Sequence, residues 1–455
     1  METKSEISPI QGVSACSLKK RLASGELSSS ELCEKLLAYL ARHEPELQSF
    51  VWLKPEYVMA EAEKKDEYRK TGAPLGILHG LPVAMKDIID TAGIPTENGT
   101  ALDSGRVPNK DASVVSLLKA AGAIILGKTA STELAFMKPA KTRNPVNPAH
   151  TPGGSSAGSA VAVAAKLTPL ALGTQTAGSV IRPASYCGAY GFKPSFRRIP
   201  RSGILTQSPT LDTVGMFAMA VEDLALLGDA IFDHDPEDET TAPMPPPELS
   251  QICQSPVPVK PTLAFLDLPY MDQACSETHA ALEELEALLG EQAFRASLPE
   301  SFSQGLAARE CIHFAEMAKC YRHYQSRAGE TLSDELKEAL EQGMKISAFE
   351  YLTALDWIKV LTAGLEELFA RCDALVTPAA PSFAPKDLET TGNPIFNSLW
   401  TLCGTPAVTL PLFEAENGMP MGIQLVGPRG GDARLLRTAR WLEHTIRKTE
   451  SIVGE

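Results

Sequence analysis

Helical periodicities and short apolar runs alternate along the first half of this 455-residue chain, and apolar runs return near its end. The segment "GLPVAMKDII" predicts a buried strand at 83–86, bounded by glycine and proline. The next helix begins after Asp111, its expected cap, and ends at Gly122; its apolar face consists of Val114, Leu117, Leu118 and Ala121. Because "DALVTPA", "AVTLPL" and "GIQLVG" follow late in the chain, we expect an α/β fold in which both ends of the chain build one central mixed sheet flanked by helices.

The alternation stops at residues 233–261, which are rich in proline and acidic residues and predict a surface excursion or linker. Amphipathic helices follow, and we expect them to form a cap: one capped near Ser276, one over 301–324, and one from a capping box at Ser347 and Glu350 to Phe369. Residues 15–70 are also predicted to be helical, with Ser30 or a neighbour as one cap and a buried face of Leu32, Leu36, Leu37 and Leu40.

Composition excludes several classes of function. The chain has 42 Lys and Arg against 56 Asp and Glu, a net charge of −14, so it lacks the basic footprint of a nucleic-acid-binding or membrane-surface protein. It has neither a signal peptide nor an apolar run of about 18 residues, which predicts a cytoplasmic protein. Its nine cysteines form no CxxC pair or Cys/His cluster, so we expect no disulfide framework, no metal and no cofactor.

Two motif matches fail on their context. The string "GAIILGKT" fits the P-loop pattern, but a helix precedes it and Ala123 to Leu126 read as a strand, whose backbone cannot also cradle phosphate. The string "GSSAG" fits the nucleophile elbow and would make Ser156 the nucleophile, but no strand precedes it. The candidate partners His279, His313, His323 and His444 all lie in helical patterns and read as ordinary helix residues. The longer stretch "PGGSSAGSAVAVAA" turns directly into an apolar segment, so it opens an element rather than forming a linker.

A second Gly/Ser turn is better suited to chemistry. A strand at Leu170 to Leu172 leads into "GTQTAGS", where the backbone N–H groups of Thr176, Ala177, Gly178 and Ser179 are expected to form a nest for a developing oxyanion. Ser179 would then be the nucleophile beside its own oxyanion hole. The alternative is that Ser179 is only a helix N-cap.

A serine nucleophile needs a base, and Lys86 is the lysine set in an apolar strand. Burial disfavours the charged ammonium and lowers the pKa of a lysine toward about 7 to 8, where the neutral amine can accept a proton. Asp87 projects to the opposite face of that strand and is not an automatic partner. The alternative is an edge-strand lysine whose amine reaches solvent.

Together these features resemble the amidase signature family of serine amidohydrolases. The matching strings are "GLPVAMKD", "GAIILGKT", "TPGGSSAGSAVAVAA", "LGTQTAGSVIRPASYCGAYGFKPS", "GTPAVTLPL" and "GMPMGIQLVG", which extend over nearly the whole chain. The resemblance implies a Ser, cis-Ser, Lys triad in which Ser179 attacks an amide carbonyl, Ser155 relays the proton through a cis peptide bond, and Lys86 is the base. The 24-residue spacing to Ser179 selects Ser155 over Ser156.

The resemblance also implies one amidase signature domain over residues 1–455. We expect it to be divided as follows: N-terminal helices (1–72), a catalytic core (73–232), a Pro-rich excursion (233–261), a helical cap and substrate funnel (262–390), and a C-terminal return to the core (391–455). By family analogy, the N-terminal helices are candidate contacts of a homodimer.

Two departures from the family pattern bear on function. The chain has Gln175 and Ala177 where the family usually has Asp and Gly, and Arg182 stands one place later than usual. Loss of the Asp charge argues against the glutaminase (A-type) subunit of a tRNA-dependent amidotransferase, which is the alternative function. We therefore expect a free-standing amidohydrolase that cleaves a small carboxamide or an aryl or acyl amide, without nucleic-acid or membrane partners. A binding protein without activity is the alternative from a different class; a fluorophosphonate-type probe would not label its Ser179.

Overall fold

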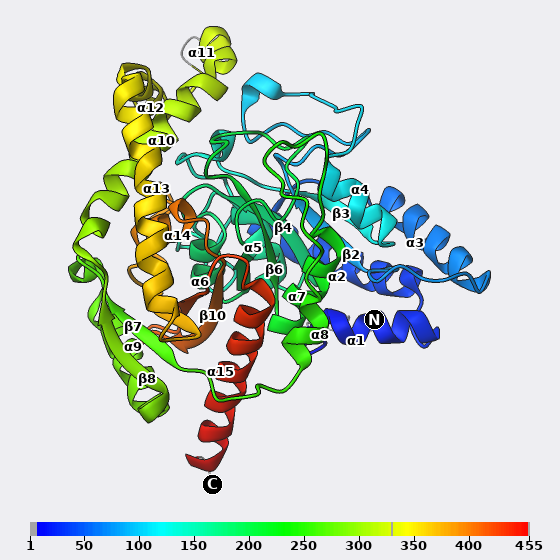
Figure 1. Cartoon of the computed structure of the whole chain (residues 1–455). Coiled ribbons are helices and arrows are strands. Elements are labelled where there is room, and N and C mark those ends of the chain that lie inside the picture. The colour runs from blue at the N-terminus through cyan, green and yellow to red at the C-terminus, as the bar shows by residue number, and fades with distance from the viewer. Residues whose placement is uncertain (1–6, 329–330, 454–455) are drawn as a thin grey trace.

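The computed structural model describes residues 7–328 and 331–453. At the centre of the fold lies one sheet of eleven strands (Figure 1). In spatial order these strands are β1 (Phe50–Trp52), β3 (Ile124–Thr129), β2 (Pro82–Lys86), β4 (Leu170–Gln175), β6 (Thr213–Ala218), β5 (Tyr190–Lys193), β10 (Ala407–Glu414), β11 (Pro420–Val426), β9 (Ala374–Pro378), β7 (Leu263–Asp267) and β8 (Ala293–Ser297). The β2 strand is parallel to β3 and β4, and β7 is parallel to β8 and β9, whereas the other neighbours are antiparallel. Pairing of β5 with β10 joins the two halves of the chain. The prediction of an α/β fold with one mixed sheet built by both ends is therefore confirmed.

Helices flank this sheet on both sides. They are α1 (Ala15–Ser24), α2 (Ser29–Leu47), α3 (Pro55–Lys70), α4 (Ser113–Ala120), α5 (Ala157–Ala164), α6 (Ile181–Cys187), α7 (Val221–Ile231), α8 (Leu249–Gln254), α9 (Ser276–Leu289), α10 (Gly305–Cys320), α11 (Arg322–Ala328), α12 (Asp334–Lys345), α13 (Ala348–Phe369), α14 (Ile395–Leu402) and α15 (Asp432–Val453). Figure 1 shows α1 to α4 on the right of the sheet and α10, α12 and α13 on the left.

Two large apolar clusters hold these layers together. One lies between the sheet and the helices α1, α2, α4, α7 and α15, and includes Leu22, Leu36 and Leu436. The other joins β9 to α10, α13 and α14, and includes Ile312 and Trp400. Each of these side chains is almost completely buried, so the second cluster fixes the cap helices against the sheet.

The helix ends follow local chemistry, with one correction. The capping box of α13 is present, because Ser347 Oγ accepts the N–H of Glu350 and the Glu350 carboxylate accepts the N–H of Ser347. Gly122, with φ +89°, follows α4 in the left-handed conformation that glycine favours, as expected. The predicted cap Asp111 is wrong: its carboxylate instead forms an ion pair with Lys119 and accepts the N–H of Ala92.

The middle of the chain contains more structure than the sequence indicated. The Pro-rich segment includes α8, which packs against α7 and α15. The strand β8 (Ala293–Ser297) was not predicted, because it is a half-exposed edge strand with the weakly apolar sequence "AFRAS". The helix expected over 301–324 is divided into a short 3-10 turn, α10 and α11.

The P-loop match and the nucleophile-elbow match both lack the backbone geometry that their motifs require. The "GAIILGKT" string begins at Gly122, just after α4, and runs through β3, and Lys128 donates hydrogen bonds to the Ile89 carbonyl and to Thr96. The segment before "GSSAG" contains no strand, and the string itself runs into α5.

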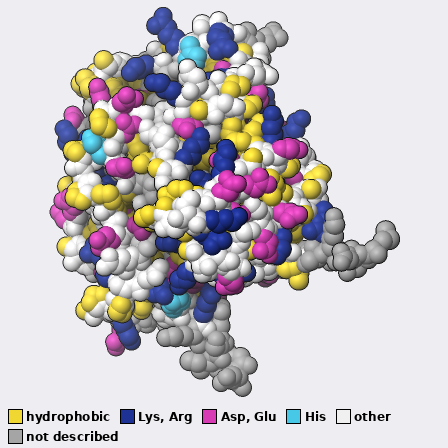
Figure 2. Space-filling model, turned by 90° about the vertical axis from the view of Figure 1, so that its right-hand side faces the viewer, with side chains coloured by type: hydrophobic (Ala, Val, Ile, Leu, Met, Phe, Trp, Pro, Cys, Tyr) yellow, Lys and Arg dark blue, Asp and Glu magenta, His cyan; other side chains and the backbone are white. Residues whose placement is uncertain are grey.

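The described surface carries both signs of charge. On the face shown in Figure 2, Lys and Arg side chains are interspersed with Asp and Glu. Within the described ranges, none of the helices is both long and apolar enough to cross a membrane.

Candidate active site

Lys86 lies at the end of β2 between its parallel neighbours β3 and β4 and is fully buried, so it is not an edge-strand lysine. Its Nζ is 2.7 Å from Ser155 Oγ and 2.9 Å from Thr174 Oγ1. Burial lowers the pKa of Lys86 to about 7, although the negative charge of Asp212 acts in the opposite direction. The amine is therefore half neutral near pH 7 and lies against a serine hydroxyl.

Ser155 follows a cis peptide bond, Gly154–Ser155, as the resemblance implied. The carbonyl of Gly154 accepts a hydrogen bond of 2.8 Å from Arg182 Nη2, which fixes this peptide from the side of α6. A Cβ on Gly154 would lie 2.9 Å from methyl carbons of Thr132 and Thr391, so the loop requires glycine for close approach.

The neighbouring Ser156 has a different role. Its Oγ accepts the N–H of Thr174 and donates to the Thr174 carbonyl, both at 3.2 Å. Ser156 thus ties the loop to β4, whereas Ser155 contacts the buried amine. Of these two serines, Ser155 is the one that contacts the Lys86 amine, and its role as the proton relay stays a prediction.

The turn after β4 presents free N–H groups. The backbone N–H groups of Ala177, Gly178 and Ser179 donate to no acceptor among the described residues. Gly178 is required by close approach, because a Cβ there would lie 2.4 Å from Asn397 Oδ1. Ser179 is partly exposed and lines the cavity described below. It is not a helix N-cap, since α6 begins later, with Val180 at the N-cap.

The side chain of Gln175, rather than that of Ser179, caps the start of α6. Its Oε1 accepts the N–H groups of Val180 (2.8 Å) and Ile181 (3.0 Å), and its Nε2 donates to Thr401 Oγ1. Because the amide oxygen accepts both of these N–H groups, the uncharged Gln175 still caps the start of α6.

Asp212 is a site residue that the sequence reasoning missed. Its buried carboxylate accepts Thr176 Oγ1–H at 2.6 Å and the N–H groups of Gln207 and Ser208. Burial raises the pKa of Asp212. It therefore anchors the start of the turn to a loop from another part of the chain, a contact that no local pattern signals.

A cavity of about 590 Å³ opens over Ser179. Its wall is built by the turn after β4, by α6, α10 and α14, and by residues 135–137, 207 and 393–394. The lining residues are Ala135, Phe136, Met137, Thr176, Ala177, Gly178, Ser179, Arg182, Gln207, Leu306, Ala307, Arg309, Glu310, His313, Phe314, Asn393, Pro394, Ile395 and Ser398. His313 lies in α10, as its helical pattern predicted, and is buried in the cavity wall.

The comparisons with known proteins agree with this geometry. The family model for amidases matches residues 31–436. The chain belongs to the amidase family. It is thus an enzyme of a family that acts on C–N amide bonds.

This amidase is similar to proteins named as the A subunit of glutamyl-tRNA(Gln) amidotransferase. It is 33% identical to that of Cyanothece sp. (strain PCC 7425 / ATCC 29141), over 90% of this chain and 93% of the relative. It is also 33% identical to that of Symbiobacterium thermophilum (strain DSM 24528 / JCM 14929 / IAM 14863 / T), over 96% and 97%.

Solved structures share the fold of this amidase. The native peptide amidase from Stenotrophomonas maltophilia has a TM-score of 0.84 at 27% identity, covering 97% of this chain and 98% of that one. A structure from a vestigial protein complex that bears on the origins of an s-triazine catabolic enzyme has a TM-score of 0.89 at 28% identity, covering 95% and 98%.

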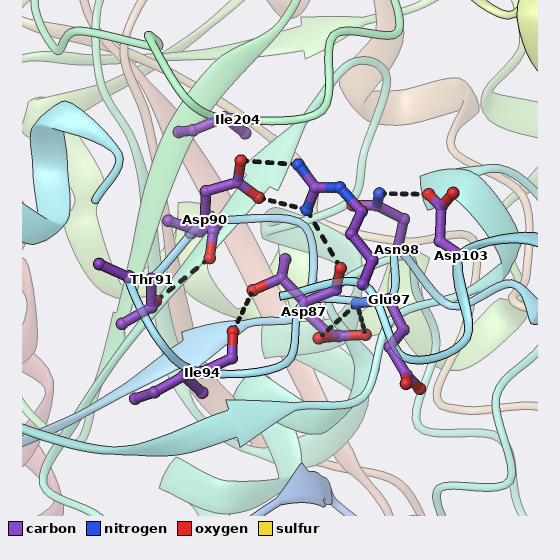
Figure 3. Close-up of polar contacts among 12 residues, drawn as sticks. Asp87, Asp90, Thr91, Ile94, Glu97, Asn98, Asp103 and Ile204 are labelled. Atoms are coloured by element: carbon purple, nitrogen blue, oxygen red, sulfur yellow. Dashed lines mark hydrogen bonds and ion pairs between the residues drawn. The ribbon is translucent and has the colours of Figure 1, made fainter. Parts of the chain in front are cut away.

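Asp87 of this amidase belongs to a separate network on the other face of β2. Its carboxylate accepts the N–H of Glu97, as Figure 3 shows, while Asp90 nearby forms a two-pronged ion pair with Arg106. These contacts hold the loop that follows Lys86. Asp87 is not a partner of the Lys86 amine, as its position in the strand predicted.

Proposed function

We propose that this chain hydrolyses amides through an acyl-enzyme, with Ser179 as nucleophile, Ser155 as proton relay and Lys86 as base. The observation that carries the proposal is the contact of 2.7 Å between the buried Lys86 amine and Ser155 Oγ. A neutral amine is needed to accept a proton, and burial supplies it near pH 7.

The first half of the cycle forms the acyl-enzyme. Ser179 Oγ bonds to the amide carbonyl carbon as its proton passes to Ser155 Oγ, whose own proton passes to Lys86 Nζ. The carbonyl oxygen becomes an oxyanion, and the N–H groups of Thr176 to Ser179 are its proposed donors. The C–N bond then breaks as the proton returns through Ser155 to the leaving nitrogen, which departs as ammonia or an amine.

Water completes the cycle. It attacks the acyl carbon of the Ser179 ester while losing a proton along the same relay, and collapse of the second tetrahedral intermediate returns that proton to Ser179 Oγ. The products are a carboxylate and the free enzyme. A relay through two hydroxyls serves both the attacking oxygen and the departing nitrogen.

The named relatives favour the alternative role, the glutaminase component of a tRNA-dependent amidotransferase, over the free-standing amidohydrolase. The hydrogen bonds of Gln175 remove the objection based on its missing charge. In this role the chain would release ammonia from glutamine and act in the cytosol with protein partners. The free-standing role is supported by the shared fold with the peptide amidase. A homodimer through the N-terminal helices stays a prediction.

The proposed division of the domain is supported by the cavity wall. Helix α10, from the segment expected to form the cap and funnel at 262–390, contributes Arg309, His313 and Phe314. We propose that this segment selects the acyl group.

Probe labelling and ammonia release test the function. We expect a fluorophosphonate-type probe to label the purified protein at Ser179, and Ser179→Ala to abolish both labelling and ammonia release from an amide panel that includes L-glutamine. Intact labelling without turnover, until partner proteins are added, would support the amidotransferase role. Turnover by the chain alone would support the free-standing role. Absence of labelling of the wild-type protein would refute the proposed nucleophile.

A further inference from the structure

Two guanidinium groups in the cavity wall have no carboxylate partner. Arg182 is 2% exposed, and its Nε and Nη1 have no hydrogen-bond acceptor. Arg309, on α10, likewise has a buried Nε without an acceptor. No Asp or Glu in the described part of the chain forms an ion pair with either side chain.

Arg309 is held in place by a neutral neighbour. Its Nη1 is 2.9 Å from His313 Nδ1, and His313 Nε2 is 3.0 Å from Gln207 Oε1. This chain of contacts fits a neutral imidazole that accepts from Arg309 and donates to Gln207. Burial and the charge of Arg309 hold the pKa of His313 well below its usual range. His313 therefore orients the guanidinium without neutralising it.

The rest of this wall offers little compensation. Phe136 and Phe314 lie beside His313, with ring centroids 6.0 and 5.6 Å from it, and Leu306 and Ile395 add apolar surface. The carboxylate that lines this part of the cavity is that of Glu310, an exposed residue that forms no ion pair with Arg309. Arg182 is buried, and Arg309 is partly exposed with a buried Nε. A charge withdrawn from water without a partner is costly, and an anion bound beside it offsets that cost.

We propose that the cavity selects an amide whose acyl part carries a carboxylate, and that Arg309 binds this carboxylate while Ser179 attacks the amide carbonyl. The fixed fork of a guanidinium matches a carboxylate in two-pronged geometry. Arg182 adds positive charge to the same cavity but also holds the Gly154 carbonyl, so Arg309 is the specificity residue to test. The inference rests on the proposed function and names its substrate class.

Matched amides separate charge from size. Succinamate and glutaramate carry a terminal carboxylate, and butyramide and valeramide replace it with a methyl group. We expect the wild-type kcat/KM to favour each anionic amide over its neutral match, and Arg309→Gln to lower that preference about 10- to 100-fold, the usual effect of losing one charged hydrogen-bonded contact. Arg309→Lys should restore part of it, because the charge returns without the fork.

Glu310→Gln is the matched control, because Glu310 lines the same cavity and neighbours Arg309 on α10. It should keep the preference for anionic amides or increase it. Calorimetric binding of the four amides to the Ser179→Ala protein provides a readout without turnover and should show the same order and the same loss in the double variant with Arg309→Gln.

The outcomes distinguish this inference from the proposed function. Equal preference in wild type and Arg309→Gln, or a wild-type preference for the neutral amides, would overturn the carboxylate site even if the probe labels Ser179. Failure of the probe to label Ser179 would refute the nucleophile, while selective binding of the anionic amides to the Ser179→Ala protein would still support the site.

Discussion

Replacing Lys86 with methionine tests whether a buried, neutral amine drives this chemistry. The variant Lys86→Met keeps an unbranched side chain of similar length and removes the ionisable group. Burial lowers the pKa of Lys86 from 10.5 to about 7. Folding of the wild-type protein therefore either removes a proton from this amine or buries its charge, and both lower the free energy of unfolding. That cost is about 4 kcal/mol at pH 7, at 1.36 kcal/mol per pKa unit.

The sign of the pH dependence follows from proton counts. Between pH 7 and 10.5 the unfolded chain holds the Lys86 proton and the folded protein does not, so the free energy of unfolding of the wild-type protein rises with pH in this window. By pH 9 the cost falls to about 2 kcal/mol. We expect the advantage of Lys86→Met in urea unfolding to shrink by about 2 kcal/mol from pH 7 to pH 9.

Labelling of Ser179 gives the catalytic half of the test. The neutral fraction of an amine with a pKa of about 7 rises about tenfold between pH 6 and pH 8, so wild-type labelling should rise by about the same factor. Lys86→Met should label far more slowly and without this rise. Lys193→Met is the matched control, because Lys193 is equally buried with a pKa lowered to about 7, yet it contacts the Thr405 carbonyl and lies outside the cavity wall. It should show the same trend in stability and keep the pH-dependent labelling.

An advantage of Lys86→Met that is unchanged between pH 7 and pH 9 would refute the low pKa of this lysine. If labelling of Ser179 depends on pH equally in the wild-type protein and in Lys86→Met, a group other than Lys86 is the base.

Three further predictions concern the neighbours of the amine. Ser155→Ala should lower the acylation rate at least 100-fold, whereas Ser156→Ala should mainly lower the melting temperature, because it loses two contacts with β4; stopped-flow labelling and thermal unfolding distinguish them. Gly178→Ala should lower labelling steeply, since its Cβ would meet Asn397 Oδ1 at 2.4 Å; unchanged labelling would contradict a tight turn. Asp212→Asn should move the inflection of the labelling rate to lower pH, because removing a negative charge lowers the pKa of Lys86; an inflection at higher pH would contradict this account.

Local patterns were sufficient for the elements that carry the proposed triad and for its chemical groups. The apolar setting of Lys86, the glycine-rich loop of Ser155 and the strand before Ser179 are short-range features, and the structure confirms their elements as β2, the loop before α5 and the turn after β4. The capping box of α13 is equally local. By contrast, Asp111 fits the sequence pattern of a helix cap, but its carboxylate forms an ion pair with Lys119 and accepts the N–H of Ala92. These contacts compete with the local cap.

What the sequence by itself determined is the fold class and the family, because these depend on periodicity and on motifs confined to a few residues each; the triad of Lys86, Ser155 and Ser179 stays a prediction. Only the tertiary structure decided how deeply Lys86 is buried, that Asp212 anchors Thr176, and that Arg182 and Arg309 line the cavity over Ser179. The physical reason is distance along the chain: Thr176 and Asp212 are 36 residues apart, and His313 and Gln207 are 106 residues apart. The charge, burial and hydrogen bonding at this site arise from contacts between segments that are far apart in the sequence.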